Sequence, residues 1–234
     1  MPELNSIVIV GASLAGLRAA AAARRAGFKG RLTLIGAETH LPYDRPPLSK
    51  QILLGQWEPA RTVLTTEADL AKLDLDLRLG RRAVSLDTAA RKVALDDETT
   101  AVYDALIIAT GATPRMIPGT PPLAGIHVLR TVEDSLAIRA AMEAGARVAV
   151  VGMGFIGAEV AAAARQRGLP TTVVEVFDHP LQRALGPTAG AAAVILDDRT
   201  VLAVAQCGIG SNDSTGCELQ PCPSKPSTSS ERDP

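Results

Sequence analysis

The sequence predicts an α/β fold that contains two Rossmann-like βαβ units. Two observations predict it: a glycine-rich turn follows a β-branched run at Ile7–Val10, and a second such turn follows the apolar run at 147–151. The length of 234 residues and the 47% hydrophobic content allow one large core or two modest ones.

The first unit extends from residue 7 to residue 36. After the strand at Ile7–Val10, an alanine-rich amphipathic stretch continues to Ala26, and Gly27 stands where a helix C-cap is expected. Residues 32–35 supply the next apolar strand. This is the usual size of a βαβ unit, about 30 residues, so we expect two parallel, buried strands.

The segment between the two units carries further strands. Residues 75–79, 83–86 and 92–95 alternate as antiparallel strands do, whereas 105–109 is uniformly apolar and predicts a buried return strand. Proline and glycine at 114–125 mark a connection. We therefore predict a first domain at 1–115 and a second, incomplete domain at 116–205.

The second unit repeats the pattern of the first. We predict a strand at 147–151, a helix at 158–167 that ends at Gly168, and a strand at 171–176. From 206 to 234, glycine, serine, threonine and proline dominate, which predicts a disordered tail. This tail contains all three cysteines, Cys207, Cys217 and Cys222, whose spacing fits no common zinc pattern, and we assign them no chemistry.

Charge and hydropathy exclude two classes of partner. The formal net charge of −1 and the scattered basic residues give no field that attracts nucleic acid or an anionic membrane. The apolar stretch at 7–23 contains Arg18 and follows no basic segment, so we interpret it as a strand and a helix, not as a signal peptide. We expect a cytoplasmic protein without a membrane span.

The turn at 152–157 has the glycine spacing that a dinucleotide pyrophosphate requires. Gly152, Gly154 and Gly157 would serve the tight turn, the close approach of the phosphates and the packing of helix on strand. Glu175, near the end of the next strand, is placed to accept hydrogen bonds from an adenosine ribose. Because a carboxylate repels a 2′-phosphate, we expect NADH rather than NADPH.

The turn at 11–16 is a variant of the same fingerprint. It contains Gly11 and Gly16, but Ser13 replaces the glycine of closest approach, and Glu38 follows as the candidate ribose acid. Both turns follow a predicted strand and open a helix. The simplest interpretation of two dinucleotide sites on one chain is that one binds a flavin, FAD, and the other a nicotinamide, NAD, with a hydride passing between them. We therefore assign FAD to the domain at 1–115 and NAD to the domain at 116–205.

Three further motifs carry a family resemblance. The segment Leu41–Lys50, the Ala109-Thr110-Gly111 turn and the Leu129–Asp134 segment resemble motifs of FAD-dependent ferredoxin, rubredoxin and putidaredoxin reductases, which share the FAD/NAD(P)-binding fold. The resemblance covers about 7–185 and implies that Lys50 and Glu159 sit beside the reactive face of the flavin as the catalytic pair. It also implies FAD contacts for Ala15, Lys50, Val84 and Arg130. The other cofactor-binding candidates lie in the motifs: Gly11, Ser13, Leu14, Gly16, Glu38, Arg45, Ala109, Thr110, Gly111, Gly152, Gly154, Phe155, Ile156, Gly157 and Glu175.

The resemblance implies an FAD-dependent NADH oxidoreductase that serves an oxygenase as its reductase component. Disulfide reductases of related architecture have a cysteine pair after the first fingerprint, and this chain has no cysteine before Cys207, so we expect a ferredoxin or rubredoxin-like electron acceptor. The match fades after about Ala189, and a later FAD-binding Gly-Asp segment is missing, so we expect an incomplete fold with weak FAD binding. The alternatives are a non-catalytic nucleotide-binding remnant, and an NADH oxidase or monodehydroascorbate-type reductase.

Overall fold

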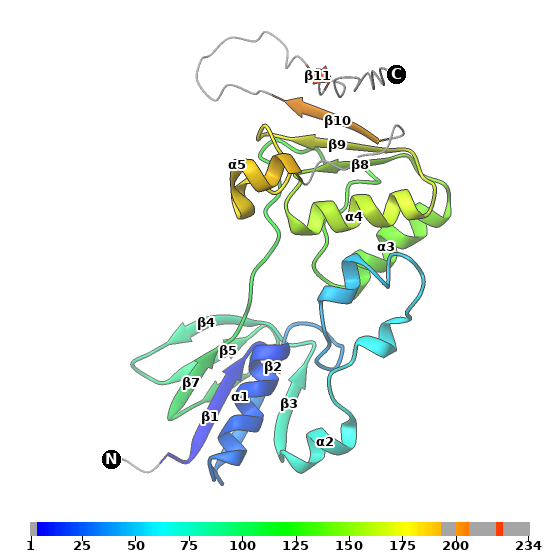
Figure 1. Cartoon of the computed structure of the whole chain (residues 1–234). Helices are drawn as coiled ribbons and strands as arrows, with labels where there is room; N and C mark the ends of the chain where they lie inside the picture. Colours follow the sequence, from blue (N-terminus) through cyan, green and yellow to red (C-terminus); the bar gives the residue numbers. More distant parts are fainter. Residues whose placement is uncertain (1–3, 193–199, 206–218, 222–234) are drawn as a thin grey trace, which may run out of the picture. The chain divides into compact units, whose positions relative to one another are not determined.

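The computed structural model describes residues 4–192, 200–205 and 219–221 (Figure 1). It divides into two compact units: unit 1 consists of Met1–Pro47 and Glu58–Pro121, and unit 2 of Leu48–Trp57 and Pro122–Pro234. Each unit carries one of the two predicted βαβ motifs, so the predicted fold class is confirmed. The functional division at residue 115 stays a prediction, and the structure adds that Leu48–Trp57 groups with unit 2.

Unit 1 is built on a four-stranded sheet in which every strand is parallel to its neighbours. Its strands are β1 (Ser6–Val10), β2 (Arg31–Gly36), β3 (Leu75–Leu79) and β7 (Ala105–Ile108), in the order β3-β2-β1-β7. Helix α1 (Leu14–Arg25) connects β1 to β2, as the sequence predicts. The short helix α2 (Glu67–Lys72) precedes β3.

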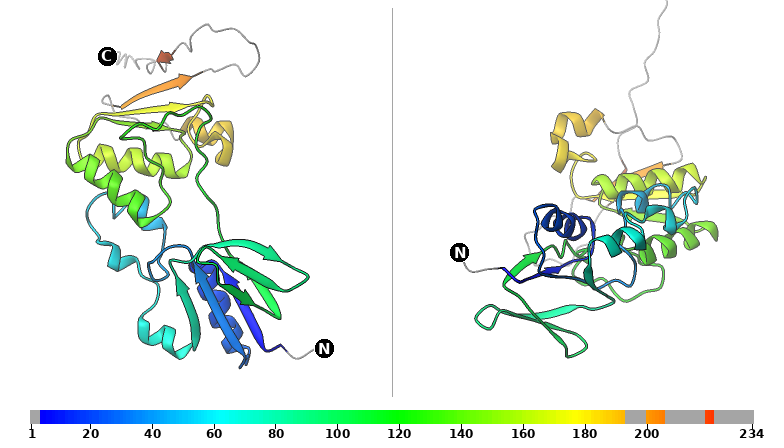
Figure 2. Two further views of the ribbon diagram at one scale, coloured as in Figure 1. Left: turned by 180° about the vertical axis from the view of Figure 1, so that it is seen from behind. Right: turned by 90° about the horizontal axis from the view of Figure 1, so that it is seen from below.

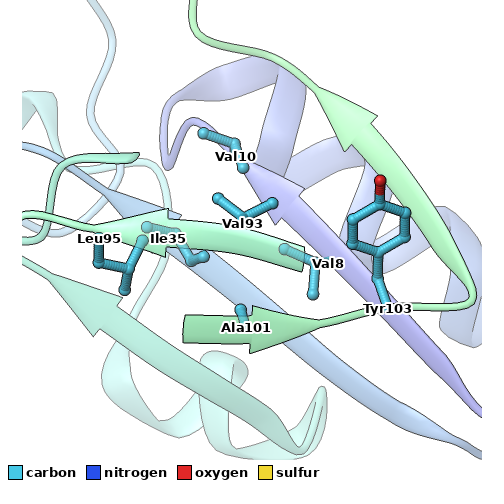
Figure 3. Packing of buried hydrophobic residues seen from close by; sticks show 7 residues of the cluster. All are labelled: Val8, Val10, Ile35, Val93, Leu95, Ala101 and Tyr103. Atoms are coloured by element: carbon cyan, nitrogen blue, oxygen red, sulfur yellow. The ribbon is translucent and has the colours of Figure 1, made fainter. Parts of the chain in front are cut away.

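Both faces of this sheet are covered, which explains why its central strands are continuously apolar. Ile9 lies in the cluster with Ala20 of α1, whereas Val8 and Val10 point to the other face and pack with Val93 (Figure 3). That second face is covered by the antiparallel sheet of β4 (Ala83–Asp87), β5 (Lys92–Leu95) and β6 (Thr100–Val102). Figure 2 shows α1 and this small sheet on opposite sides of the parallel sheet.

The structure corrects the prediction for residues 75–79. They alternate in hydropathy and were expected to form an antiparallel strand, but β3 is parallel to β2, with Leu75 opposite Leu32. The alternation has another cause: β3 is the edge strand, and all of its residues are only half buried. An edge strand is less covered than a central one, so its sequence can alternate whatever the direction of its neighbour.

The predicted ends of the two long fingerprint helices are confirmed. Helix α1 ends at Arg25, and Gly27 follows with φ +88°, its N–H donating to the carbonyl of Arg24 while Phe28 donates to Ala23. This pair of bonds is the Schellman motif, in which a left-handed residue closes the helix. The helix before Gly168 ends with the same two bonds.

Arg24 ties together two loops of unit 1. Its guanidinium lies over the Phe28 ring, 5.6 Å from the ring centre. It donates four hydrogen bonds of 2.7–2.9 Å to main-chain carbonyls, those of Phe28, Gly30, Leu73 and Asp74. One side chain therefore joins the α1–β2 loop to the α2–β3 loop.

Unit 2 has a second sheet in the order β11-β10-β9-β8. Strands β8 (Val148–Val151), β9 (Thr171–Glu175) and β10 (Thr200–Ala205) are parallel, and β11 (Leu219–Pro221) is antiparallel to β10. Helix α4 (Phe155–Gln166) connects β8 to β9 and packs beside α3 (Val132–Glu143), which the sequence did not predict. Helix α5 (Gln182–Ala192) is kinked at Gly186.

The predicted disordered tail, 206–234, lies outside the described residues except for β11. That short strand is a correction to the prediction, because Leu219–Pro221 pairs with β10. The three cysteines lie outside the described residues. No helix in the described part of the chain has the length and apolar character needed to cross a membrane.

Candidate functional site

The first glycine turn, between β1 and α1, is held tightly against the end of β7. Gly11 has φ +118°, and a Cβ there would lie 2.0 Å from the carbonyl oxygen of Ala109. A Cβ on Gly16 would lie 1.9 Å from the carbonyl oxygen of Gly11. Both positions therefore require glycine. The contact with Ala109 also places the predicted Ala109-Thr110-Gly111 turn beside the fingerprint.

Ser13, the variant position of this turn, does not strain the backbone. It is the N-cap of α1 with φ −113° and ψ −163°, an extended conformation that any residue adopts. Its counterpart Gly154 is the N-cap of α4 with φ −76° and ψ −172°. The backbone therefore does not require glycine at this second position of either fingerprint.

The second glycine turn repeats this geometry in unit 2. A Cβ on Gly157 would lie 1.9 Å from the carbonyl oxygen of Gly152, which itself has φ +93°. By contrast, in the described part of the chain no atom beyond the neighbouring residues and the helix's own backbone lies within 4 Å of the Cβ position of Gly154. The turn therefore leaves open space at the point where the pyrophosphate approach is predicted.

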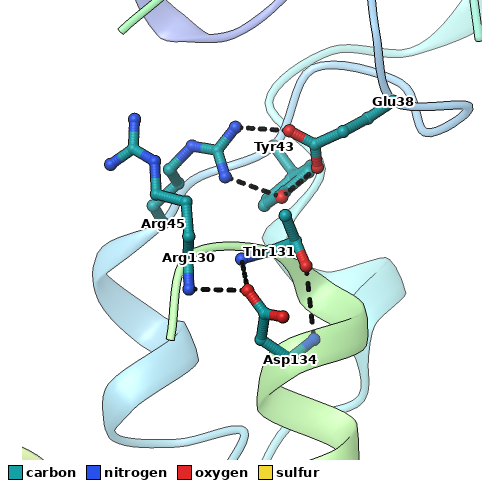
Figure 4. Close-up of polar contacts among 6 residues, drawn as sticks. All are labelled: Glu38, Tyr43, Arg45, Arg130, Thr131 and Asp134. Carbon is teal, nitrogen blue, oxygen red and sulfur yellow. Dashed lines mark hydrogen bonds and ion pairs between the residues drawn. The ribbon is translucent and has the colours of Figure 1, made fainter. Parts of the chain in front are cut away.

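The two fingerprint helices differ from α2 and α3 at their N-termini. Neither Ser13 at α1 nor Gly154 at α4 makes a side-chain capping bond, and neither helix has an acidic residue in its first turn. In contrast, Thr66 caps α2, and Thr131 with Asp134 forms a capping box on α3 (Figure 4). Both of these helices also have acidic residues in their first turn. Free N–H groups and the positive end of the dipole at α1 and α4 suit an anionic phosphate.

Glu38, the predicted ribose acid of unit 1, is held by two neighbours (Figure 4). The Tyr43 hydroxyl donates to one carboxylate oxygen at 2.5 Å, and Arg45 donates to the other at 2.6 Å. Arg45 also donates to the Tyr43 hydroxyl at 2.9 Å and lies over its ring, 4.9 Å from the centre. Since an ionised carboxylate accepts about four hydrogen bonds, Glu38 keeps acceptor capacity for a ligand.

Glu175, the predicted ribose acid of unit 2, is nearly buried, with 7% of its surface exposed. One carboxylate oxygen accepts from the N–H of Met153 at 2.5 Å, and the other accepts from those of Val176 at 2.7 Å and Phe177 at 3.2 Å. The carboxylate therefore joins the end of β9 to the glycine turn. It shapes the turn whether or not it also contacts a ribose.

Lys50 and Glu159, the predicted catalytic pair, form an ion pair of 2.8 Å between Nζ and Oε1 within unit 2. The second oxygen of Glu159 accepts a short hydrogen bond from the Ser49 hydroxyl. Burial acts to raise the pKa of Glu159, but the hydrogen bonds from Lys50 and Ser49 outweigh it and hold this pKa below its usual value. Glu159 therefore carries a negative charge at neutral pH.

The remaining candidates lie at positions that a ligand can reach. Val84 is the extra residue of a bulge, because Ala83 and Ser85 pair with the consecutive residues Leu95 and Ala94 of β5. Arg130 precedes the capping box of α3 and folds with unit 2. The first turns of the fingerprint helices expose Leu14, Ala15, Phe155 and Ile156.

Two residues of this arrangement escaped the sequence analysis as functional candidates. Tyr43 and Ser49 both lie in the Leu41–Lys50 segment, and each hydrogen-bonds a carboxylate that was itself a candidate. The sequence signal that could have identified Tyr43 and Ser49 was their position in the same segment as the predicted Arg45 and Lys50.

Comparison with known proteins shows a consistent set of relatives. The ferredoxin–NAD(+) reductase component of the anthranilate 1,2-dioxygenase system of Burkholderia cepacia is 46% identical over 196 residues, 83% of this chain and 48% of that protein. The corresponding component of the p-cumate 2,3-dioxygenase system of Pseudomonas putida is 42% identical over 190 residues, 81% of this chain and 47% of that protein.

A solved structure agrees with them. The ferredoxin reductase for the CYP199A2 system from Rhodopseudomonas palustris is 37% identical with a TM-score of 0.76, and the match covers 80% of this chain and 46% of that one. The chain spans about half the length of the curated relatives it matches. The model of one family, described as pyridine nucleotide-disulphide oxidoreductase, matches residues 5–197. Since this match includes both glycine turns, the chain belongs to the pyridine nucleotide-disulphide oxidoreductase family.

Proposed function

We propose that the chain holds the pyrophosphate of FAD at the glycine turn of unit 1 and that of NADH at the glycine turn of unit 2, and that it performs the NADH-oxidising step of a ferredoxin reductase. The observation that carries the proposal is the pair of uncapped helix N-termini, α1 and α4, each of which follows a glycine turn and lacks acidic residues in its first turn. The named relatives, reductase components of dioxygenase systems, support the same function.

The residues of each turn fit a dinucleotide. Gly11 and Gly16 allow the tight turn that leads into α1, and Gly154 leaves the space at the start of α4 open. Glu38 lies just after β2, and Glu175 is the last residue of β9, which are the positions where a ribose hydroxyl finds its acceptor in this fold. A carboxylate at Glu175 also disfavours the 2′-phosphate of NADPH.

The chemistry that the flavin supplies when bound is acceptance of a hydride and release of single electrons. Lys50 presents a positive charge that would stabilise negative charge on the flavin ring, and the ion pair with Glu159 orients the Lys50 ammonium. Thr131 and Asp134 fix the start of α3, and so the backbone of Arg130, by their reciprocal bonds. The proposed electron acceptor is a ferredoxin or a rubredoxin-like protein, and the NADH requirement agrees with the predicted cytoplasmic location.

The test is flavin retention by the full chain, with Ser13→Asp as the matched variant. Aspartate is a good N-cap, so α1 should remain folded, but its charge repels a pyrophosphate at the same place. We expect the wild type to show a bound-flavin absorbance spectrum after incubation with FAD and to lose it on anaerobic addition of NADH. We expect Ser13→Asp to keep its circular dichroism spectrum and to bind no flavin.

Other outcomes separate the alternatives. Failure of the wild type to bind flavin at saturating FAD would refute the reductase function for this chain, and NADH binding without flavin would then favour the nucleotide-binding remnant. Rapid oxygen consumption with NADH and no protein acceptor would favour the oxidase alternative. Reduction of a ferredoxin, followed by its absorbance change, would support the proposed acceptor.

A further inference from the structure

The segment Leu48–Trp57 is firmly anchored in unit 2. Ser135 of α3, which is 0% exposed, donates its hydroxyl to the carbonyl of Leu48 at 2.6 Å. Arg167, at the end of α4, donates to the carbonyl of Leu53 at 2.6 Å, and the Leu53 side chain is buried in the cluster that contains Met142. The segment therefore presents Ser49 and Lys50 from a fixed main chain.

Ser49 and Lys50 divide the two oxygens of one carboxylate between them. Lys50 Nζ contacts Oε1 of Glu159, and the Ser49 hydroxyl donates to Oε2. The two donors differ in burial: Ser49 is 5% exposed, whereas the Lys50 side chain is 41% exposed. The buried donor is the one whose position is fixed by its surroundings.

An ion pair between partly exposed side chains does not by itself set a geometry. Such pairs contribute little free energy, because water screens them and two long side chains must be ordered. A hydrogen bond from a buried hydroxyl to a carboxylate is stronger and shorter than one between neutral groups. Of the two donors, Ser49 is the more buried, and it holds Glu159 directly from an anchored main chain.

We propose that Ser49 is a positioning residue for the flavin-facing lysine: its hydroxyl fixes the carboxylate of Glu159, which in turn holds the Lys50 ammonium in one place. This inference rests on the proposed function for its effect on hydride transfer. The geometric part, the hold of Ser49 on Glu159, concerns this chain's own residues only.

The experiment compares Ser49→Ala with Ser49→Thr, which retains a hydroxyl, and with Ser135→Ala as a matched control. Ser135→Ala removes the other serine hydroxyl that anchors this segment, but it takes nothing from Glu159. In the full chain without cofactor, the pKa of Glu159 is followed by ¹³C NMR of the side-chain carboxyl, assigned with Glu159→Gln. We expect Ser49→Ala to raise this pKa, and Ser49→Thr and Ser135→Ala to leave it near the wild-type value.

In the FAD-loaded full chain, stopped-flow absorbance measures flavin reduction by NADH. We expect Ser49→Ala to slow reduction about tenfold, with the Kd for NADH unchanged, and Ser49→Thr to restore most of the rate. An unchanged Glu159 pKa in Ser49→Ala would overturn the proposal. A raised pKa with an unchanged reduction rate would overturn the positioning role. If no variant binds FAD, the proposed function fails, and the NMR arm still decides whether Ser49 holds Glu159.

Discussion

Two of the three glycines in the second turn, Gly154 and Gly157, should give opposite results when each is changed to alanine. In Gly157→Ala the new Cβ would lie 1.9 Å from the carbonyl oxygen of Gly152, whereas real Cβ atoms come no closer than 3.0 Å. Since that oxygen is main chain, the helix must shift away from the strand. We expect a loss of about 3 kcal/mol in the free energy of unfolding.

Gly154→Ala should leave stability almost unchanged. Its Cβ meets no atom within 4 Å, and its φ of −76° suits alanine. Alanine is a poorer N-cap than glycine by up to about 1 kcal/mol, and the smaller conformational entropy of the unfolded chain returns about 0.4–1 kcal/mol. However, the methyl group occupies the space through which the pyrophosphate is predicted to approach, so we expect NADH to bind at least about tenfold more weakly.

Two measurements separate these effects. Urea denaturation followed by circular dichroism gives the stability of each variant, and isothermal titration with NADH gives its affinity. Wild-type NADH affinity in a stable Gly154→Ala variant would show that the pyrophosphate does not pass this residue. Wild-type stability in Gly157→Ala would refute the inference that the turn forces glycine there.

Two further predictions concern unit 1. Arg24→Met removes four hydrogen bonds to main-chain carbonyls and should lower the free energy of unfolding by about 3 kcal/mol. The control Arg25→Met changes an exposed side chain and should alter this free energy by less than about 0.5 kcal/mol. Urea denaturation measures both, and equal effects would contradict the role of Arg24. Hydrogen bonds from the N–H of Asn5 and from Ser6 lower the pKa of Asp104 below its ordinary 3.8. Its carboxylate therefore stabilises the fold above that value, and this contribution disappears as the pH falls through the lowered pKa. Asp104→Asn should be less stable than wild type at pH 7, with the difference shrinking below 3.8, and a pH-independent difference would argue against it.

The parts of the fold predicted from sequence are those whose signal is local. The strand at β1 is buried on both faces and therefore reads as a continuous apolar run, and Gly27 marks the helix end because the Schellman motif needs a left-handed residue. The direction of β3 could not be predicted in this way. Its partner, β2, lies far away in the sequence, and the alternation of an edge strand carries no information on direction.

The candidate site shows the same division. The glycine turns were predicted because the spacing of their glycines is local in the sequence, as is the contact of Gly157 with Gly152. The pairing of Lys50 with Glu159 joins residues far apart in the chain, and only family resemblance suggested it. The role of Ser49 depends on which carboxylate oxygen its hydroxyl reaches, and no periodicity or spacing encodes that.

Because Leu48–Trp57 folds with unit 2, each of the two units is made of two separate stretches of the chain. It leaves unit 1 after Pro47, returns after Trp57 and leaves again after Pro121. A protease that cuts the connection at 112–121 would thus release no free N-terminal piece, because that piece still carries Leu53 in the core of the other unit. For the same reason, exchange of the two units between homologous proteins at a single crossover after Pro121 would separate Leu53 from its own core. A chimera that keeps each unit intact needs two further crossovers, after Pro47 and after Trp57.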